Sequence, residues 1–599
     1  MNCQLVRLNV MACVVMGLMT QGIETGWAEK PYRRSTDTGL LVAQAGAVQP
    51  DQAKAAEAKP GPPAAAQNEM SGFEVKTFIV EGSSLLSQEK IDEALEKYKG
   101  QGRQMADMER ARGTLEKAYQ ALGFPTIVVT IPEQTIDDGT VRMQVIEGRL
   151  GQIRVTGNQY YPRFQILQKL PSLRLGNLIE EKKLVKELDA VNVNPDLKVT
   201  PVLKPGGELG NVNLELKVKD RLPLHAKLTG DNKGPFTTPA NRLTAEVSYT
   251  NLWNADHIVS FQTIQTPTDW GAVQGYSATY VAPIKGPQNA VALYVSKVIS
   301  NSILGGSTLA ISPGNVSVAG NATVAGVRYF FPIFEGGATT HSLTFGADYK
   351  RLEKTEATFP GNLGTAVVLS PIQYLPLSLG YSMVRPDPLG VTLFSVTAKG
   401  YWPILPGGKK EDFTGDPNDP FNKPGQRRGA TGKFAVVQAS LDRPQALPLG
   451  FNLLLHADGQ WASEPLVPAE SYFAGGADSV RGYVQSEAIS DHALRGRAEL
   501  TTPNLIDVPI DMIWQRRRSS EVKIEWKVAA FYDVAQLWIA KAPIGQKDQF
   551  RLEGVGAGIR AQLVPYNLAL KIDQGWALRD ATTTRRGDTF VHFMVTVAY

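Results

Sequence analysis

Polar and apolar side chains alternate along most of the chain after residue 221. In residues 242–250 every second side chain is apolar, at Leu243, Ala245, Val247 and Tyr249, and the side chains between them are polar. Successive side chains of a β-strand point to opposite faces, so this period of two predicts strands with one apolar and one polar face. Such runs occur about sixteen times, and an even number of them is typical of a bacterial outer-membrane barrel with a wet lumen.

The predicted strands form an antiparallel barrel over residues 221–599. They lie near residues 222–230, 240–251, 256–267, 272–283, 289–300, 322–332, 340–350, 373–384, 390–401, 432–442, 450–461, 491–502, 522–533, 551–562, 566–575 and 589–599. The chain ends in an aromatic strand, with Phe593 and Tyr599 on the same face. A soluble β-sandwich would share the alternation, but it would not account for that terminal strand together with long connections alternating with short turns.

A weak internal repeat of about 75 residues precedes the barrel. FEVKTFIVEGSSLLSQEKI (residues 73–91) is echoed by LGQIRVTGNQYYPRFQIL (residues 150–167). The first copy predicts the order β-α-α-β-β over residues 72–148, and the second predicts a helix near 180–191 and strands at 197–203 and 212–218, within residues 149–220. The second helix of the first copy has one apolar face at helical spacing, formed by Met108, Ala111, Leu115, Ala118, Tyr119 and Leu122.

The N-terminal segment reads as a secretory signal. Arg7 precedes an apolar run over residues 8–19, and small residues follow as far as Ala28, so we predict a signal peptide over residues 1–28. Both cysteines, Cys3 and Cys13, lie inside it, which leaves the predicted mature chain without a disulfide. Met11 does not fit a lipoprotein cleavage site, although the residues before Cys13 are faintly similar to one.

Residues 29–71 are rich in alanine and proline and cannot bury enough apolar surface to fold alone. Residues 51–59 could form a short helix that the following prolines stop. A disordered tether is the alternative.

The whole chain has 599 residues, a formal net charge of +4 and 20% charged residues. After the N-terminus no apolar run reaches the roughly 18 residues that a membrane helix needs. Basic and acidic residues are interleaved, so the small positive charge does not indicate nucleic-acid binding.

A loop over residues 462–490 separates two alternating runs and contains YFAGGADSVRGY (residues 472–483). Glycines of this kind allow tight bends, so the loop can turn back into the lumen with Arg481. In residues 521–534, parity places Phe531 and Asp533 on the lumen face. An arginine and a carboxylate so placed predict a bidentate pair. The alternative is an ordinary extracellular loop.

These residues resemble two motifs of the outer-membrane transporters of two-partner secretion, of the haemolysin/haemagglutinin secretion-activation type. Val480, Arg481, Gly482 and Tyr483 resemble the family's VRGY loop motif, and Phe531 with Asp533 resembles its F-x-D strand motif. Residues 131–158 resemble the junction between two POTRA domains of that family. The resemblance implies two periplasmic POTRA domains, a barrel of about sixteen strands, and a helix within residues 29–71 that plugs the pore.

The implied function is an outer-membrane pore of a Gram-negative bacterium that recognises an unfolded exported partner through its POTRA domains and secretes it to the cell surface without ATP. The implied partners are a large secreted client of adhesin or haemolysin type, outer-membrane lipids, and the barrel-assembly machinery, for which Phe593 and Tyr599 resemble the insertion signal. A barrel-assembly factor is the alternative. A passive porin would leave the N-terminal repeats without a role.

Signals of catalysis are few. The six histidines are isolated, no pair has the spacing of metal ligands, and neither GxSxG nor GxxxxGK[ST] occurs. His456 and Asp458 share a lumen face, which leaves a Ser–His hydrolase as a remote alternative. We expect no enzyme activity, cofactor or metal.

Overall fold

The structure, a computed structural model, describes residues 41–42 and 72–599, apart from residues 137, 209, 236–237, 285–288, 301–320, 335–338, 359–364, 403–406, 421, 510–522, 543–546 and 565–566. The chain divides into two compact units, one that ends at Leu222 and one that contains Pro223–Tyr599. The predicted signal peptide and the predicted helix at residues 51–59 lie outside the described residues. No helix among the described residues is long and apolar enough to cross a membrane.

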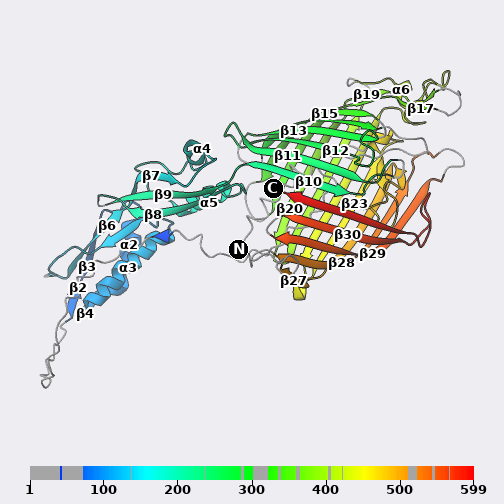
Figure 1. The fold of residues 1–599 in the computed structure, drawn as a ribbon. Coiled ribbons are helices and arrows are strands. Elements are labelled where there is room, and N and C mark those ends of the chain that lie inside the picture. The colour runs from blue at the N-terminus through cyan, green and yellow to red at the C-terminus, as the bar shows by residue number, and fades with distance from the viewer. Residues whose placement is uncertain are drawn as a thin grey trace. The chain divides into compact units, whose positions relative to one another are not determined.

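The C-terminal unit is a closed antiparallel barrel of sixteen long strands, shown in green to red in Figure 1. Strand β10 pairs with β31, so the ring closes and leaves no open edge. The long strands are β10 (Leu224–Asp231), β11 (Arg242–Leu252), β12 (His257–Gln265), β13 (Val273–Pro283), β14 (Ala290–Ser300), β15 (Ala322–Phe334), β16 (Thr340–Leu352), β20 (Leu377–Asp387), β21 (Gly390–Tyr401), β22 (Phe434–Ala446), β23 (Asn452–Ala462), β26 (His492–Thr501), β28 (Lys523–Trp538), β29 (Gln549–Val564), β30 (Leu568–Ala577) and β31 (Thr589–Ala598). Two short strands, β19 (Ile372–Tyr374) and β27 (Ile506–Pro509), extend the ring at its rims.

The alternation in the sequence corresponds to the two faces of the barrel wall. On β28, Val528 and Tyr532 are each 42% exposed on the outer face, whereas Phe531 and Asp533 are buried on the inner face. On β23, Leu455 and Trp461 face outward, and Gln460 is buried inside. Because the lipid-facing residues occupy only alternate positions, only one face of each strand has to be apolar.

Two details of the predicted strands are wrong. The predicted eighth strand at residues 373–384 is divided between β19 and β20. Asp533, predicted at the end of its strand, lies well inside β28, which continues to Trp538. The continuation has apolar inward side chains at Ala535 and Leu537, because these pack against a loop inside the lumen rather than against water.

Two small α/β domains make up the N-terminal unit. The first contains β2 (Phe73–Val75), β3 (Thr77–Glu81), α2 (Gln88–Leu95), β4 (Gly100–Arg103), α3 (Met105–Ala121), β5 (Ile127–Thr130) and β6 (Thr140–Glu147). Its sheet has the order β3-β6-β5, and β2 pairs with β4 separately. The predicted apolar face of α3 packs into the core through Met108, Ala111, Leu115 and Tyr119. Leu122, predicted on that face, is 40% exposed because the helix ends before it.

The second domain repeats the β-α-α-β-β order of the first, without counterparts of β2 and β4. It contains β7 (Arg149–Thr156), α4 (Arg163–Gln168), α5 (Glu181–Val191), β8 (Leu197–Pro205) and β9 (Asn211–Asp220). The sheet order is β1-β8-β9-β7, in which β1 (Leu41–Val42) pairs in parallel with β8. Gly82 and Gly157, which align in the sequence repeat, have φ angles of 82° and 86°.

Candidate functional site

The connection between β23 and β26, residues 463–491, folds back inside the barrel; we call it the lumen loop. It contains a short hairpin in which β24 (Tyr472–Ala474) pairs with β25 (Ala488–Ser490). The hairpin tip carries the predicted motif, and Val480, Arg481 and Tyr483 are completely buried. The predicted bends are present, because the three glycines of the tip have positive φ angles, at Gly475, Gly476 and Gly482.

The structure brings Arg481 and Asp533 into direct contact. Arg481 donates from Nε to Asp533 Oδ2 at 2.7 Å and from Nη2 to Oδ1 at 2.9 Å. The main-chain N–H of Arg481 also donates to Oδ2, at 3.0 Å. Phe531, two residues earlier on the same face, lies under the guanidinium, with its ring centre 3.3 Å from Cζ. Both motifs therefore meet at one place on the wall.

Arg481 has two further acidic partners that the sequence did not reveal. Its Nη1 donates to Glu499 on β26 and, at 3.2 Å, to Asp573 on β30. Each of the three carboxylates also has a cation on the wall. Arg497 donates to Asp533 at 3.0 Å, Arg560 donates to both Glu499 and Asp573, and Lys571 lies 3.6 Å from Asp573. We call these seven side chains the tip network: Arg481, Arg497, Glu499, Asp533, Arg560, Lys571 and Asp573.

Glycines in the wall make room for the backbone of the motif. A Cβ atom at Gly554 on β29 would lie 1.9 Å from the Arg481 carbonyl oxygen, and one at Gly575 on β30 would lie 2.5 Å from Gly482 N. A side chain at either position would displace the loop. Glycines at alternate positions of EGVGAGIR (residues 553–560) were the sequence signal for this close approach.

Tyr483 fixes the loop tip to the wall through main-chain groups. Its hydroxyl can donate a hydrogen bond to the carbonyl oxygen of Glu553, at 3.0 Å, or to that of Arg579, at 2.9 Å. The same hydroxyl accepts the N–H of each of those residues. The tyrosine ring packs with Val480, Leu537 and Leu552. All four residues of the predicted motif therefore lie at the loop–wall contact.

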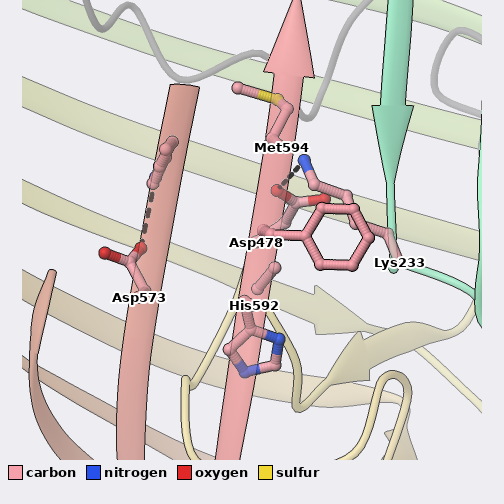
Figure 2. A pocket seen from close by; sticks show the side chains of 8 residues that line it. Lys233, Asp478, Asp573, His592 and Met594 are labelled. Atoms are coloured by element: carbon pink, nitrogen blue, oxygen red, sulfur yellow. Dashed lines mark hydrogen bonds and ion pairs between the residues drawn. The ribbon is translucent and has the colours of Figure 1, made fainter. Parts of the chain in front are cut away.

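The loop tip also reaches the first strand of the barrel. Figure 2 shows Lys233, just after β10, meeting Asp478 of the lumen loop beside β31, with Nζ 2.6 Å from Oδ1. A small pocket lies here, lined by Lys233, Ala477, Asp478, Lys571, Asp573, His592, Phe593 and Met594. Phe593 and Tyr599, the predicted insertion signal, are 37% and 75% exposed.

A second charged cluster holds the base of the loop against a different part of the wall. Glu470, whose side chain is fully buried, accepts hydrogen bonds from Lys350 on β16 and from the Tyr374 hydroxyl on β19, the latter at 2.8 Å. Lys399 on β21 lies 3.8 Å from the other carboxylate oxygen. Burial alone would raise the pKa of Glu470, but the two lysines outweigh it and hold that pKa below its usual value.

The polar contacts of this region hold the lumen loop against the barrel wall. Among the described residues, no group of three or more His, Cys, Asp or Glu side chains is arranged to hold a metal ion. His456 contacts Asp442 and Asp458 at 2.6 and 2.7 Å, and Tyr472 donates to Asp458. Asp458 therefore joins the wall to the lumen loop, whereas Asp442 and His456 form a contact within the wall.

Two family models match the chain. A model of the ShlB-type POTRA domain matches residues 73–148. A model of the haemolysin secretion/activation protein ShlB/FhaC/HecB matches residues 414–561, which include the lumen loop and β28. The second model covers the VRGY and F-x-D motifs, and the first covers residues 131–148 of the stretch that resembles a POTRA junction.

Similar proteins and structures agree with these models. The heme/hemopexin transporter protein HuxB of Haemophilus influenzae is 19% identical over 471 residues, which cover 78% of this chain and 76% of HuxB. The outer membrane transporter CdiB of Escherichia coli is 23% identical over 195 residues, 32% of each chain. The solved structure of Escherichia coli CdiB matches with a TM-score of 0.55 and 17% identity over 90% of this chain and 93% of CdiB. BamA from Haemophilus ducreyi, lacking POTRA domains 1–3, matches with a TM-score of 0.51 and 13% identity over 88% of this chain and all of that one.

Fold and matches together define the class: an outer-membrane β-barrel transporter with a periplasmic POTRA domain. The structural likeness alone shows only the fold, because BamA matches nearly as well as CdiB. The family models and the sequence relatives make the finer distinction. By its family models and sequence relatives, the chain resembles the haemolysin secretion/activation type of two-partner secretion transporters, and those relatives are transporters rather than enzymes.

Proposed function

We propose that this transporter recognises an unfolded, exported client through its POTRA domains and conducts it through the barrel to the cell surface without ATP. The client is a large secreted protein of adhesin or haemolysin type. The observation that carries the proposal is the combination of a loop-filled lumen with small sheet domains that have strand edges available for pairing. An extended client segment can add to such an edge through main-chain hydrogen bonds.

The first domain has the features of an edge that can accept a strand. In its sheet, β5 and β3 are the outer strands, and each pairs with β6 on one side. Val128 on β5 is 45% exposed and Ile79 on β3 is 39% exposed, whereas the opposite face of the sheet packs on the helices. An unfolded client would bury these side chains while its backbone pairs with the edge.

We assign the second domain, residues 149–220, as a second POTRA domain. Its β-α-α-β-β order matches that of β3, α2, α3, β5 and β6 in the first domain, and Gly157 repeats the backbone conformation of Gly82. The boundaries proposed from the sequence, 72–148, 149–220 and 221–599, fall between the observed elements. In the second sheet β8 already pairs with β1, so β7 is the outer strand that we propose for pairing with an extended client.

Transport without ATP follows from the location and from the client. The periplasm holds no ATP, so folding of the client outside the cell is the proposed source of free energy. The outward-facing apolar side chains of the barrel would contact outer-membrane lipids. Phe593 and Tyr599 on the terminal strand would be read by the barrel-assembly machinery during insertion. A barrel-assembly factor is not favoured, because the matched family models and sequence relatives are those of secretion transporters.

Deletion of residues 73–219 tests the role of the domains, because β10 begins after them, at Leu224. The shortened chain should still reach the outer membrane and should secrete no client. Secretion at the normal level would show that the barrel alone recognises the client.

A point substitution separates edge pairing from a general effect of the domain. Val128→Lys places a charge on the outer strand β5, where lysines block strand addition. Gln144→Lys, on the same exposed face but on the central strand β6, is the matched control. Client secretion should fall only with Val128→Lys, and equal loss in both variants would contradict edge pairing.

A further inference from the structure

Three connections on the extracellular end of the barrel converge on one carboxylate. Strands are antiparallel and the periplasmic domains precede β10, so the β21–β22, β23–β26 and β28–β29 connections all lie at the outer end. Asp491, the last residue of the lumen loop, is completely buried there. It accepts the N–H of Leu466 in the lumen loop at 2.8 Å and the N–H of Ala540 in the β28–β29 connection at 2.7 Å.

The third connection supplies the charge that balances Asp491. Arg427, in the β21–β22 connection, donates from Nη1 to Asp491 Oδ1 and from Nη2 to Oδ2 at 2.8 Å. Its Nη1 also donates to the Leu466 carbonyl oxygen at 3.0 Å. The arginine is itself positioned, because its main-chain N–H donates to the Phe413 carbonyl oxygen at 2.9 Å. A buried carboxylate with four donors from three segments holds those segments in one arrangement.

Beside this pair the same segments close over an apolar cluster. Phe413 and Ala430 of the β21–β22 connection pack with Leu466, Val467 and Ala469 of the lumen loop. Aromatic side chains of the wall complete the cluster, at Tyr374, Tyr401 and Phe434. The cluster joins the β21–β22 connection and the lumen loop to the wall at the outer end of the barrel, so displacement of that connection would break this apolar contact.

We propose that the Arg427–Asp491 pair is a latch that positions the β21–β22 connection over the outer mouth and holds the pore shut there. The latch is separate from the tip network, which fastens the other end of the lumen loop. Its opening would release the β21–β22 connection, while the Arg481 contacts stay in place. The proposal rests on the chain being a translocation pore, but it makes predictions that need no client.

Thiol labelling measures the opening directly. In a chain with Cys3 and Cys13 replaced by alanine, Ala430→Cys places a thiol in the cluster, where Ala430 is 2% exposed. Arg427→Ala removes charged hydrogen bonds to Asp491, so labelling by a membrane-impermeant maleimide should speed up by about tenfold or more. Channel openings in planar bilayers should become more frequent in the same variant.

Two controls come from the same connection. Lys423 pairs with Asp416 at 3.8 Å and is 62% exposed, so Lys423→Gln should change neither labelling nor conductance. Lys423→Cys should label rapidly in every background. Asp491→Ala should open the mouth at least as far as Arg427→Ala, because it also frees the N–H groups of Leu466 and Ala540. Adding Arg427→Ala to it should change little.

Arg427→Ala decides the question, since it leaves the Asp491 contacts with Leu466 and Ala540 in place. Labelling of Ala430→Cys at the unchanged rate, together with unchanged conductance, would overturn the latch. Neither measurement depends on secretion, so a failure of the proposed client recognition would leave this result standing, and the reverse also holds.

Discussion

Removing Asp533 should release the lumen loop further than removing Arg481, although the two form one pair. The tip network contains four cations and three carboxylates. Arg481→Ala leaves three cations and three carboxylates, and every carboxylate keeps a cation of the barrel wall as its partner. Asp533→Ala leaves four cations facing two carboxylates, with Arg481 and Arg497 both deprived of their shared acceptor.

The expected magnitudes follow from what each change leaves behind. Arg481→Ala removes hydrogen bonds to charged groups without stranding a charge, which costs about 2–3 kcal/mol. Asp533→Ala leaves uncompensated buried positive charge, which costs about 3–5 kcal/mol. In the double variant the excess charge falls again, so it should be no worse than Asp533→Ala alone.

The loop's release can be measured by thiol protection. Ala488 in the lumen loop is 4% exposed, so Ala488→Cys in the cysteine-free chain should be protected while the loop is seated. The ratio of labelling rates gives the free energy of release, because each 1.4 kcal/mol is about tenfold. Arg328→Ala is the matched control, since Arg328 forms a bidentate pair with Asp348 within the wall, at 12% and 7% exposure.

Two outcomes would refute this reasoning. Equal or greater release by Arg481→Ala would mean that the count of charges does not govern the seating of the loop. If the free-energy costs of the two single substitutions add fully in the double variant, Arg481 and Asp533 act through separate contacts. A similar release caused by Arg328→Ala would show that the assay reports on the stability of the barrel instead.

Two further predictions concern the space inside the pore. Gly554→Ala would place a methyl group 1.9 Å from the Arg481 carbonyl oxygen, so it should unseat the loop and raise labelling of Ala488→Cys. Gly496→Ala is its control, because the nearest atom to that Cβ lies at 3.6 Å, and an equal effect would contradict the close-approach argument. Deletion of residues 29–63 should raise single-channel conductance and leave secretion largely unchanged, if this segment holds a removable pore element. Unchanged conductance would favour a plain tether.

The sequence predicted those features that depend on local pattern. A period of two is visible in residues 242–250, and the strands of the barrel followed from it. The Arg481–Asp533 contact was predictable for two reasons. The glycines of the loop motif allow the chain to turn back into the lumen, and the alternation of the strand places Asp533 on the lumen face. Glu499, Asp573 and Arg560 were not predictable as partners, because they lie on the neighbouring strands β26, β29 and β30, and the alternation gives the face of each side chain but not the register between strands.

The base of the lumen loop was missed for a related reason. Glu470 and Asp491 stand in a segment without periodicity, and nothing near them in the sequence indicates Lys350 or Arg427 as partners. Apolar inward residues such as Leu537 broke the expected polar lumen face, and they do so where the loop fills the lumen. Departures from the barrel pattern therefore mark the position of the loop, and such departures are a usable signal once the fold class is known.

The charge arrangement at the loop tip also bears on the proposed opening of the pore. If the loop leaves, Asp533 keeps Arg497, Glu499 keeps Arg560, and Asp573 keeps Arg560 and Lys571. The wall therefore strands no carboxylate, and Arg481 gains hydration as it moves into water. A pair of isolated buried charges would resist separation much more strongly. A loop seated on a wall that already balances its own charges leaves no unpaired carboxylate behind when it moves, which lowers the cost of the opening that we propose for an entering client.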